Sequence, residues 1–261
     1  MTWLHWAGQW SFDPSVWVGC ALLLPAYLFL PGRRPDRRMV SWAAGVLLLF
    51  VALESAIDQV GDNYLFSVHM AQHLLLAMVA PPLLVFGLPW QTLRTWWRSP
   101  IGRALGRALS PGPAGVAYVA ILVGWHWPPI FEYALTDPLA HVAQHASFIA
   151  AGLLFWGAVR VQRSPAKRSR RRRPGFTYLM VCGAVPGLVV GLTLALLTTP
   201  AYSFYLYRSP LLGISALGDQ RLGGWLMFIF DAVLMLGAAV VDLRHPAPDE
   251  QPTLTREHGV T

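Results

Sequence analysis

The sequence predicts an all-α integral membrane protein, a bundle of about seven transmembrane helices with its N-terminus outside and its C-terminus in the cytoplasm. Three observations lead to this fold class. Charged residues make up only 13% of the 261 residues and hydrophobic residues 55%, whereas soluble domains carry about 25% charged residues. The few charges leave long uncharged intervals, and the cations gather in alternate loops. Soluble globular, disordered and collagen-like classes are therefore excluded.

The uncharged intervals define the predicted spans, since a helix needs about 20 mostly apolar residues to cross a membrane. Six such intervals, and a seventh apolar stretch that contains only the acid Asp231, provide them. In order, the predicted helices cover 14–30, 40–57, 69–88, 113–128, 139–160, 176–197 and 222–241. Prolines crowd both ends of the fourth, so its ends are expected to shift.

These spans form one predicted domain, residues 14–242. An outer N-terminal segment, residues 1–13, precedes it, and a cytoplasmic tail, residues 243–261, follows it. The tail is expected to be disordered.

The orientation follows from the distribution of Lys and Arg. Four cations lie at 33–38, four at 94–107, eight at 160–173 and two in the C-terminal tail, all on one predicted side. Only Arg208 and Arg221 lie on the other side. By the positive-inside rule the first side is cytoplasmic. The basic charge therefore indicates topology rather than nucleic-acid binding, and we expect the loop at 160–173 to touch anionic lipid headgroups.

Five of the eight histidines lie at helix ends that this topology places on the outer side. The third and fifth predicted helices run in the same direction and open with HMAQH at 69–73 and HVAQH at 141–145, and the fourth ends at Trp125-His126. Residues i and i+4 share a helix face, so each pair of imidazoles can converge on one ion. Ionisable groups embedded in spans usually mark function. We therefore predict a metal site whose ligands are His69, His73, His126, His141 and His145.

Other polar residues on the same side could support metal binding by the histidines. Gln72 and Gln144 fall on the histidine faces and could hold an imidazole N–H. Asp219 and Gln220 immediately precede the seventh predicted helix and could add a ligand or a hydrogen bond. Further acids at the outer helix ends and loops are Asp58, Asp62, Glu132 and Asp137. Glu54 and Asp231 lie deeper in the membrane. Because a charged carboxylate costs free energy there, we expect each to be protonated and hydrogen-bonded in a structural role.

The order of these blocks resembles the polytopic CtaG family of bacterial cytochrome c oxidase assembly factors. The resemblance rests on the two histidine motifs, on Pro81-Pro82 and Gly87-Leu88-Pro89, on His126 before Pro128, on Gly152 and Phe155-Trp156, and on Asp219-Gln220 before Gly223-Gly224. It covers about residues 40–242 and departs from the family pattern at Gln144, where many relatives carry an acid. A different, single-span copper chaperone shares the name but carries a Cys pair, which is missing here because Cys20 and Cys182 stand alone.

The resemblance implies a non-enzymatic protein of the bacterial plasma (inner) membrane that helps to assemble haem-copper oxidases, whose subunits would be its partners. It also implies that the protein binds copper or helps to deliver it. On this hypothesis His69, His73, His141 and His145 hold the ion, and His126 is a fifth or exchanging ligand. Met70 and Met78 form no regular stripe, so packing is their expected role. The aromatic loop from Tyr202 to Tyr207 could cover the site, although an interfacial aromatic belt is favoured.

Other function classes remain open from the sequence. Imidazole also suits zinc, iron and nickel, so an intramembrane zinc hydrolase with a carboxylate base such as Asp219 is one alternative. A bis-histidine haem b electron carrier is another, although these histidines are shallow for haem. A transporter built from two repeats is a weaker alternative, because parallel helices two apart are not the usual inverted arrangement.

Overall fold

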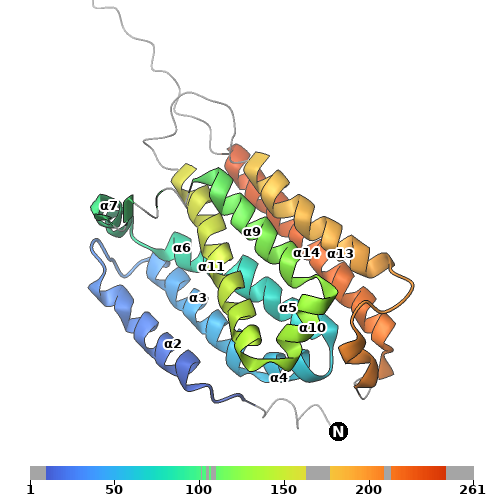
Figure 1. Ribbon diagram of the computed structural model, residues 1–261. Helices are drawn as coiled ribbons and strands as arrows, with labels where there is room; N and C mark the ends of the chain where they lie inside the picture. The colour runs from blue at the N-terminus through green and yellow to red at the C-terminus, as the bar shows by residue number, and fades with distance from the viewer. Residues whose placement is uncertain are drawn as a thin grey trace, which may run out of the picture.

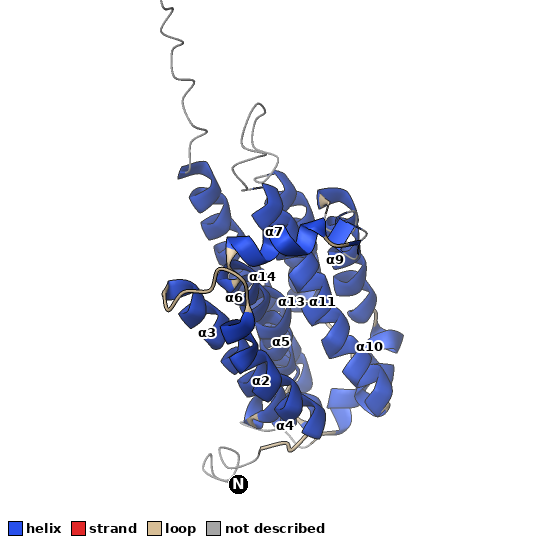
Figure 2. Ribbon diagram, turned by 90° about the vertical axis from the view of Figure 1, so that its left-hand side faces the viewer, coloured by secondary structure: helices blue, strands red, loops and turns tan. Residues whose placement is uncertain are grey.

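The computed structural model describes residues 10–100, 102–103, 106, 110–162, 177–208 and 213–244. The basic residues at 163–173, most of the predicted N-terminal segment and nearly all of the predicted tail lie outside these ranges. The described residues are almost entirely helical and contain no strand (Figures 1 and 2). The predicted all-α fold class is confirmed for them.

The helices follow the predicted order with shifted ends. Their bounds are α2 Pro14–Ala26 with η1 Tyr27–Phe29, α3 Arg37–Glu54, α4 Ala56–Asn63, α5 Phe66–Leu74, η2 Leu75–Val79, α6 Ala80–Gly87, α7 Trp90–Arg98, α9 Pro111–Trp125, α10 Pro128–Thr136, α11 Pro138–Gln162, η4 Leu179–Ala184, α13 Val185–Leu196, η5 Ser203–Tyr207 and α14 Ala216–Arg244.

Four helical segments are long and apolar enough to cross a membrane: Phe66–Gly87, Pro138–Gln162, Leu179–Leu196 and Ala216–Val241. Two bent pairs, α3 with α4 and α9 with α10, raise the number to six if each is one span. The first predicted span corresponds to a shorter apolar helix, Pro14–Phe29. The described residues thus support four to six spans, and the count of seven stays a prediction.

Polar caps and prolines explain the shifted ends. The predicted helix 40–57 bends by 43° between α3 and α4, because the Ser55 side chain accepts a hydrogen bond from Ile57 N and starts a new helix. The predicted helix 113–128 ends at Trp125, and Pro128 begins α10 at an angle of 76° to α9. Proline suits the first turn of a helix, where its missing N–H is not needed.

The third and seventh predicted helices begin earlier than expected. The α5 helix begins at Phe66, and α14 begins at Ala216, so Asp219 and Gln220 lie inside the first turns of α14 rather than before it. The Ser215 side chain accepts a hydrogen bond from Gly218 N at that start. Their predicted position immediately before this helix was therefore wrong.

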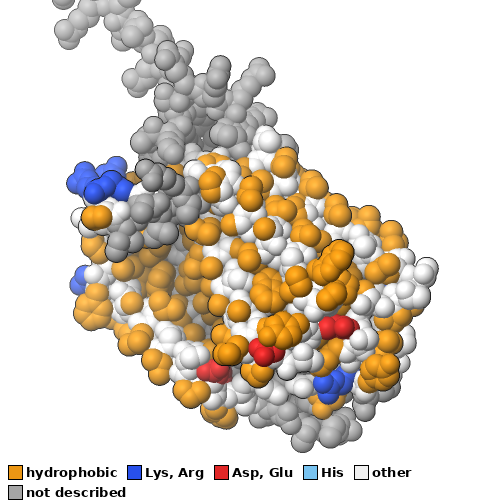
Figure 3. Space-filling view, viewed as in Figure 1, with side chains coloured by type: hydrophobic (Ala, Val, Ile, Leu, Met, Phe, Trp, Pro, Cys, Tyr) orange, Lys and Arg blue, Asp and Glu red, His pale blue; other side chains and the backbone are white. Residues whose placement is uncertain are grey.

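The surface and the two ends of the bundle differ in character. Large apolar side chains are exposed on α2, α9, α13 and α14, and hydrophobic side chains cover the middle of the face in Figure 3. The basic helix α7 lies across one end of the bundle, whereas α4 and α10 lie at the opposite end (Figures 1 and 2). This arrangement is typical of a bundle embedded in lipid.

Two acids lie deep within the bundle. Glu54 is fully buried and accepts hydrogen bonds from Trp17 Nε1 at 2.9 Å and from Asp13 N at 3.3 Å. Asp231 is also buried, against Gly187, but neither of its oxygens has a hydrogen-bond partner among the described residues. The expected hydrogen-bonded role is therefore seen for Glu54 and not for Asp231.

Candidate metal centre

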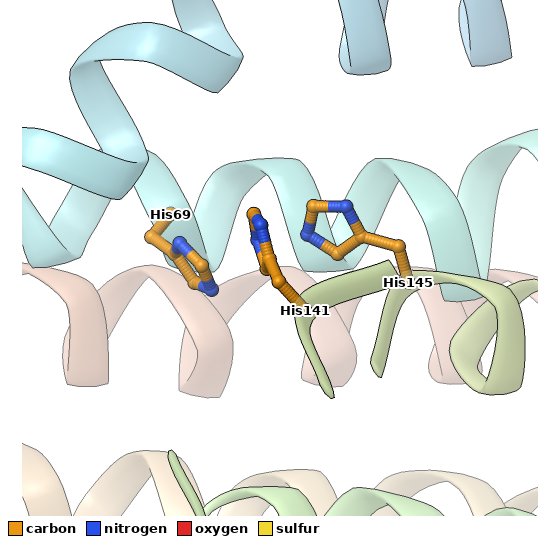
Figure 4. Close-up of side chains that lie close together, drawn as sticks. All are labelled: His69, His141 and His145. Atoms are coloured by element: carbon orange, nitrogen blue, oxygen red, sulfur yellow. The ribbon is translucent and has the colours of Figure 1, made fainter. Parts of the chain in front are cut away.

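Three histidines converge between α5 and α11. Ligand nitrogens of His69, His141 and His145 all lie within 4.8 Å of one another. Figure 4 shows His69 extending from α5 and the other two from α11, with the three rings close together. This convergence of side chains about 70 positions apart is what the two HxAQH motifs predict for parallel neighbouring helices.

The carboxylate of Asp62 orients His69. Its Oδ1 atom lies 3.0 Å from His69 Nδ1 and 3.4 Å from His141 Nε2. An ionised carboxylate only accepts hydrogen bonds, so His69 Nδ1 carries the proton and Nε2 keeps its lone pair. His69 Nε2 has no partner among the described residues. This is the arrangement in which a carboxylate fixes the tautomer of a metal-ligating imidazole.

His73 joins the three histidines one turn further along α5. Its ring centroid lies 4.2 Å from that of His69 and 5.5 Å from that of His145. Both of its ring nitrogens are buried without a hydrogen-bond partner among the described residues. His73 therefore has a free lone pair whichever tautomer it adopts.

His126 lies beyond this group, at the end of α9. Its Nδ1 is 2.6 Å from the carbonyl oxygen of Leu122, and its Nε2 is 3.3 Å from the Met70 sulfur. Its ring centroid is 6.2 Å from that of His73. The sequence correctly placed His126 near the other histidines but gave no reason to expect its contact with Met70.

The histidines differ in their access to the surface. The side chains of His141 and Asp62 are 20% and 21% exposed, respectively, whereas His69, His73 and His145 are buried. The site thus opens at the end of the bundle where α4 lies. The solvent exposure of its side chains falls toward His73. A ligand would reach His141 and Asp62 first.

Close helix packing brings these side chains together. A Cβ atom on Gly61 would lie 3.0 Å from the backbone of His69, so α4 lies directly against α5 and Asp62 reaches its imidazole. A Cβ atom on Gly152 would lie 2.4 Å from the carbonyl oxygen of Ala77, so α11 contacts η2 closely. This π-helical segment precedes Pro81 and Pro82, which supply no backbone N–H for regular helical hydrogen bonds.

The two glutamines differ in their partners. Gln72 donates hydrogen bonds to the carbonyl oxygen of Ala52 at 2.9 Å and to Asp58 Oδ1 at 2.8 Å, rather than to an imidazole. It links α5 to α3 and α4. Gln144 is buried beside the His69 imidazole, as predicted, but its polar atoms make no hydrogen bond of ordinary geometry among the described residues.

Asp219 and Gln220 position the helices around the site. Asp219 accepts hydrogen bonds from Phe66 N at 2.6 Å and Ser67 N at 3.2 Å, and also from the Ser67 hydroxyl. It therefore caps the N-terminus of α5, the helix that carries His69. Gln220 accepts from Ala201 N and donates to the carbonyl oxygen of Leu194.

The remaining outer acids also serve as caps or helix links. Asp58 accepts from Ser11 and Gln72, Glu132 accepts from Ser203 and Phe204, and Asp137 accepts from Ala140 N. Asp62 is the one acid of this set for which the described residues show an imidazole contact. Its distinguishing feature in the sequence is its position seven residues before His69.

An aromatic layer lies beside the cluster. Tyr202 and Tyr205 are buried, and their hydroxyls donate to the carbonyl oxygens of His126 and Gly61 at 3.0 and 2.8 Å. Burial raises the pKa of both phenols above the usual value, so they stay protonated donors. The favoured interpretation as an interfacial belt was wrong for these two residues, whereas Tyr207 is 87% exposed.

The arrangement fits a transition-metal ion. Buried polar atoms normally have hydrogen-bond partners, yet His69, His73 and His145 each present a buried ring nitrogen without one among the described residues, and His141 Nε2 has only its 3.4 Å contact with Asp62. Neutral imidazole nitrogens are ligands for copper, zinc, iron and nickel. The cluster therefore has the donor set and the carboxylate support of a metal site.

The comparisons identify relatives over the same residues. The profile of the family described as "Cytochrome c oxidase caa3 assembly factor (Caa3_CtaG)" matches residues 25–245. Uncharacterised proteins of Mycobacterium leprae and Mycobacterium bovis are 29% and 26% identical over 82% and 88% of this chain. The chain spans 36% and 39% of the length of these two relatives. No solved structure matches.

Proposed function

Because the chain belongs to the family of cytochrome c oxidase caa3 assembly factors, we propose that it binds copper at its histidine cluster and delivers it to a haem-copper oxidase. The single observation that carries the proposal is the buried convergence of unpartnered imidazole nitrogens from α5 and α11, one imidazole held by Asp62. Copper is the cargo here rather than a resident cofactor.

The donor set supports copper among the metals that imidazole can bind. First-row divalent ions bind a nitrogen and oxygen site in an order that peaks at Cu²⁺. In the proposed site His69, His141 and His145 hold the ion near Asp62, and His73 lies next to them. The carboxylate offsets part of the ion's charge in a low-dielectric region, where an unpaired charge is costly.

The proposed location is the outer face of the bacterial plasma membrane. The Lys and Arg distribution supports this orientation. The helix α4, whose Asp62 contacts His69, lies at the end of the bundle opposite the basic helix α7 (Figure 2). Copper would arrive and leave past the partly exposed His141 and Asp62. Transfer would proceed as ligands of an acceptor site on the oxidase replace the imidazoles one at a time.

Metal analysis of the purified full-length protein tests this proposal. We expect copper in the wild type and much less in His73→Ala and His145→Ala, with His258→Ala, in the predicted tail, as the matched control. Equal content near zero in all four proteins would contradict the ligand assignment. Zinc as the retained metal, or a haem absorbance band, would favour the hydrolase or the haem carrier instead.

Oxidase assembly provides the second test. A deletion strain should lose cytochrome c oxidase activity and oxidase-bound copper, and the wild-type gene should restore both. His73→Ala and His145→Ala should restore neither, although each variant is present in the membrane at normal abundance. Normal oxidase in the strain without the gene would rule out an assembly role.

A further inference from the structure

The contact between His126 and Met70 brings together two hydrogen-bond acceptors. A carbonyl oxygen only accepts, so at 2.6 Å from Leu122 O the Nδ1 atom of His126 is the protonated nitrogen. In the neutral ring Nε2 then carries a lone pair, and it lies 3.3 Å from a thioether sulfur that has no hydrogen to donate. Nothing in the pair supplies a proton for this contact, although both side chains are buried.

Met78, on the same continuous helix, provides the contrast. Its sulfur lies 2.9 Å from the hydroxyl oxygen of Tyr118, and this hydroxyl donates the proton. Met78 is therefore a packed thioether with an ordinary weak hydrogen bond. Met70 differs because the group that it faces is a lone-pair donor.

His73 supplies a third donor atom. It lies three residues after Met70, on the same face of α5. Its ring centroid is 6.2 Å from that of His126, and both of its nitrogens lack a partner among the described residues. Two imidazoles and a thioether thus lie near one another in the buried region between α5 and the end of α9.

We propose that Met70, His73 and His126 form a second metal subsite, selective for Cu(I), beside the group formed by His69, His141 and His145. The inference rests on the proposed function and adds to it the oxidation state of the ion and a separate place for it. Thioether sulfur is a soft ligand that selects Cu(I) over harder divalent ions. The separation of Nε2 and the sulfur is within a few tenths of an ångström of the roughly 3.6 Å that two ligands of one tetrahedral ion would have.

The charges around the two groups support this division. In the part of the chain that the structure describes, no carboxylate contacts Met70, His73 or His126, so the second subsite holds no anionic ligand, whereas Asp62 contacts His69 and His141. A monovalent ion costs much less to bury without an anion than a divalent ion does. The neutral subsite therefore suits Cu(I), whereas the group beside Asp62 can hold a divalent ion.

The two subsites are adjacent and differ in depth. The His73 and His145 ring centroids are 5.5 Å apart. His141 and Asp62 are partly exposed, whereas Met70 is fully buried. A Cu(I) ion that enters past His141 would reach the thioether last, with no change in its oxidation state.

Anaerobic loading of the purified full-length protein with Cu(I) tests the second subsite. X-ray absorption at the copper edge should show a sulfur neighbour at about 2.3 Å, the usual length of a metal–sulfur bond in proteins. Met70→Leu should abolish this feature. It should also weaken Cu(I) binding at least ~10-fold in competition with a chromophoric Cu(I) chelator, because loss of a ligand should cost no less than loss of an outer-shell partner.

Met78→Leu is the matched control and should leave both the sulfur feature and the Cu(I) affinity unchanged. Leu replaces Met at nearly constant volume, and unchanged Cu(II) binding by Met70→Leu would show that the fold and the other group are intact. A sulfur feature that survives in Met70→Leu, or that disappears equally in Met78→Leu, would overturn the subsite. Wild type that binds Cu(I) through nitrogen alone would refute this inference and leave the proposed function standing. Wild type that binds no copper in either oxidation state would refute both.

Discussion

The protonation of two imidazoles is set by the acceptor that one of their nitrogens meets. His69 meets the carboxylate of Asp62, and His126 meets the carbonyl oxygen of Leu122. In both rings Nδ1 is therefore the donor, and Nε2 is left for a ligand. Under the proposed function, the two lone pairs are preset before an ion arrives, which lowers the free-energy cost of binding.

Asp62→Asn should weaken metal binding without removing any imidazole. The amide keeps nearly the same shape but loses the charge that holds His69 and that offsets the charge of a bound cation. We expect the affinity of the cluster for Cu(II) to fall about 10–100-fold, the usual cost of losing an outer-shell partner. A competition titration with a metal-binding chromophore measures this change.

Asp58→Asn is the matched control, one turn earlier on α4. The Asp58 side chain accepts hydrogen bonds from Ser11 and Gln72 and contacts no imidazole in the described residues. The Cu(II) affinity of the Asp58→Asn protein should stay within a few fold of the wild-type affinity. Equal losses of Cu(II) affinity in the two variants would mean that both substitutions act by destabilising α4 rather than by removing the carboxylate that contacts the imidazoles.

The sequence predicted the proximity of the histidines better than their hydrogen-bond partners. All five histidines lie in one neighbourhood, as the two motifs and the topology indicated. Asp219 was predicted only as a ligand or hydrogen-bonding residue and Met70 only as a packing residue. The contacts of Asp62 with His69, of Asp219 with Phe66 and of His126 with Met70 were not predicted, because each joins different helices. Helical spacing identifies residues on one face, but it contains no information about which neighbour that face meets.

At the scale of elements, close packing positions the cluster. The α11 helix can bring His141 and His145 to α5 because Gly152 allows its backbone to approach Ala77. Small residues are the common means of such close approach between membrane helices. The site therefore depends on a glycine two turns away from the nearest histidine.

Gly152→Ala should lower both stability and metal affinity. The added Cβ atom would lie 2.4 Å from the Ala77 carbonyl oxygen and 2.7 Å from Pro81 Cγ, so α11 must move away. Overpacking of this kind costs about 1–3 kcal/mol in the free energy of unfolding. Thermal unfolding in detergent and the Cu(II) titration measure the two effects.

Gly237→Ala serves as the comparison, since a Cβ atom there would meet nothing within 4 Å. Alanine is the better helix former, so this variant should match or slightly exceed the wild-type melting temperature. If Gly152→Ala behaved in the same way and kept full metal affinity, the packing of α11 on η2 would not be what positions the histidines.

For the whole molecule, composition predicted the fold class and left the bends undetermined. The uncharged intervals located each long helix to within several residues. The breaks at Ser55 and before Pro128 lie within three residues of the ends of two predicted spans, and the short helices α4 and α10 that follow them lie almost entirely beyond those spans. A local cap or a proline starts each of these short helices, and hydropathy alone does not reveal them. The predicted helix 222–241 was also shorter than α14, because the first turns of α14 are polar but still helical.

Cysteine labelling of the intact membrane tests the orientation on which the proposed route of copper depends. In a variant with Cys20→Ala and Cys182→Ala, a single cysteine is introduced either by Tyr207→Cys or by Arg34→Cys, both at exposed positions. Tyr207 lies in η5, near the histidine end, and Arg34 lies in a basic loop that the positive-inside rule assigns to the cytoplasm. A membrane-impermeant maleimide should label Tyr207→Cys in intact spheroplasts and Arg34→Cys only after the membrane is opened. The reverse pattern would place the histidine cluster at the cytoplasmic face, where copper would have to be delivered from inside the cell.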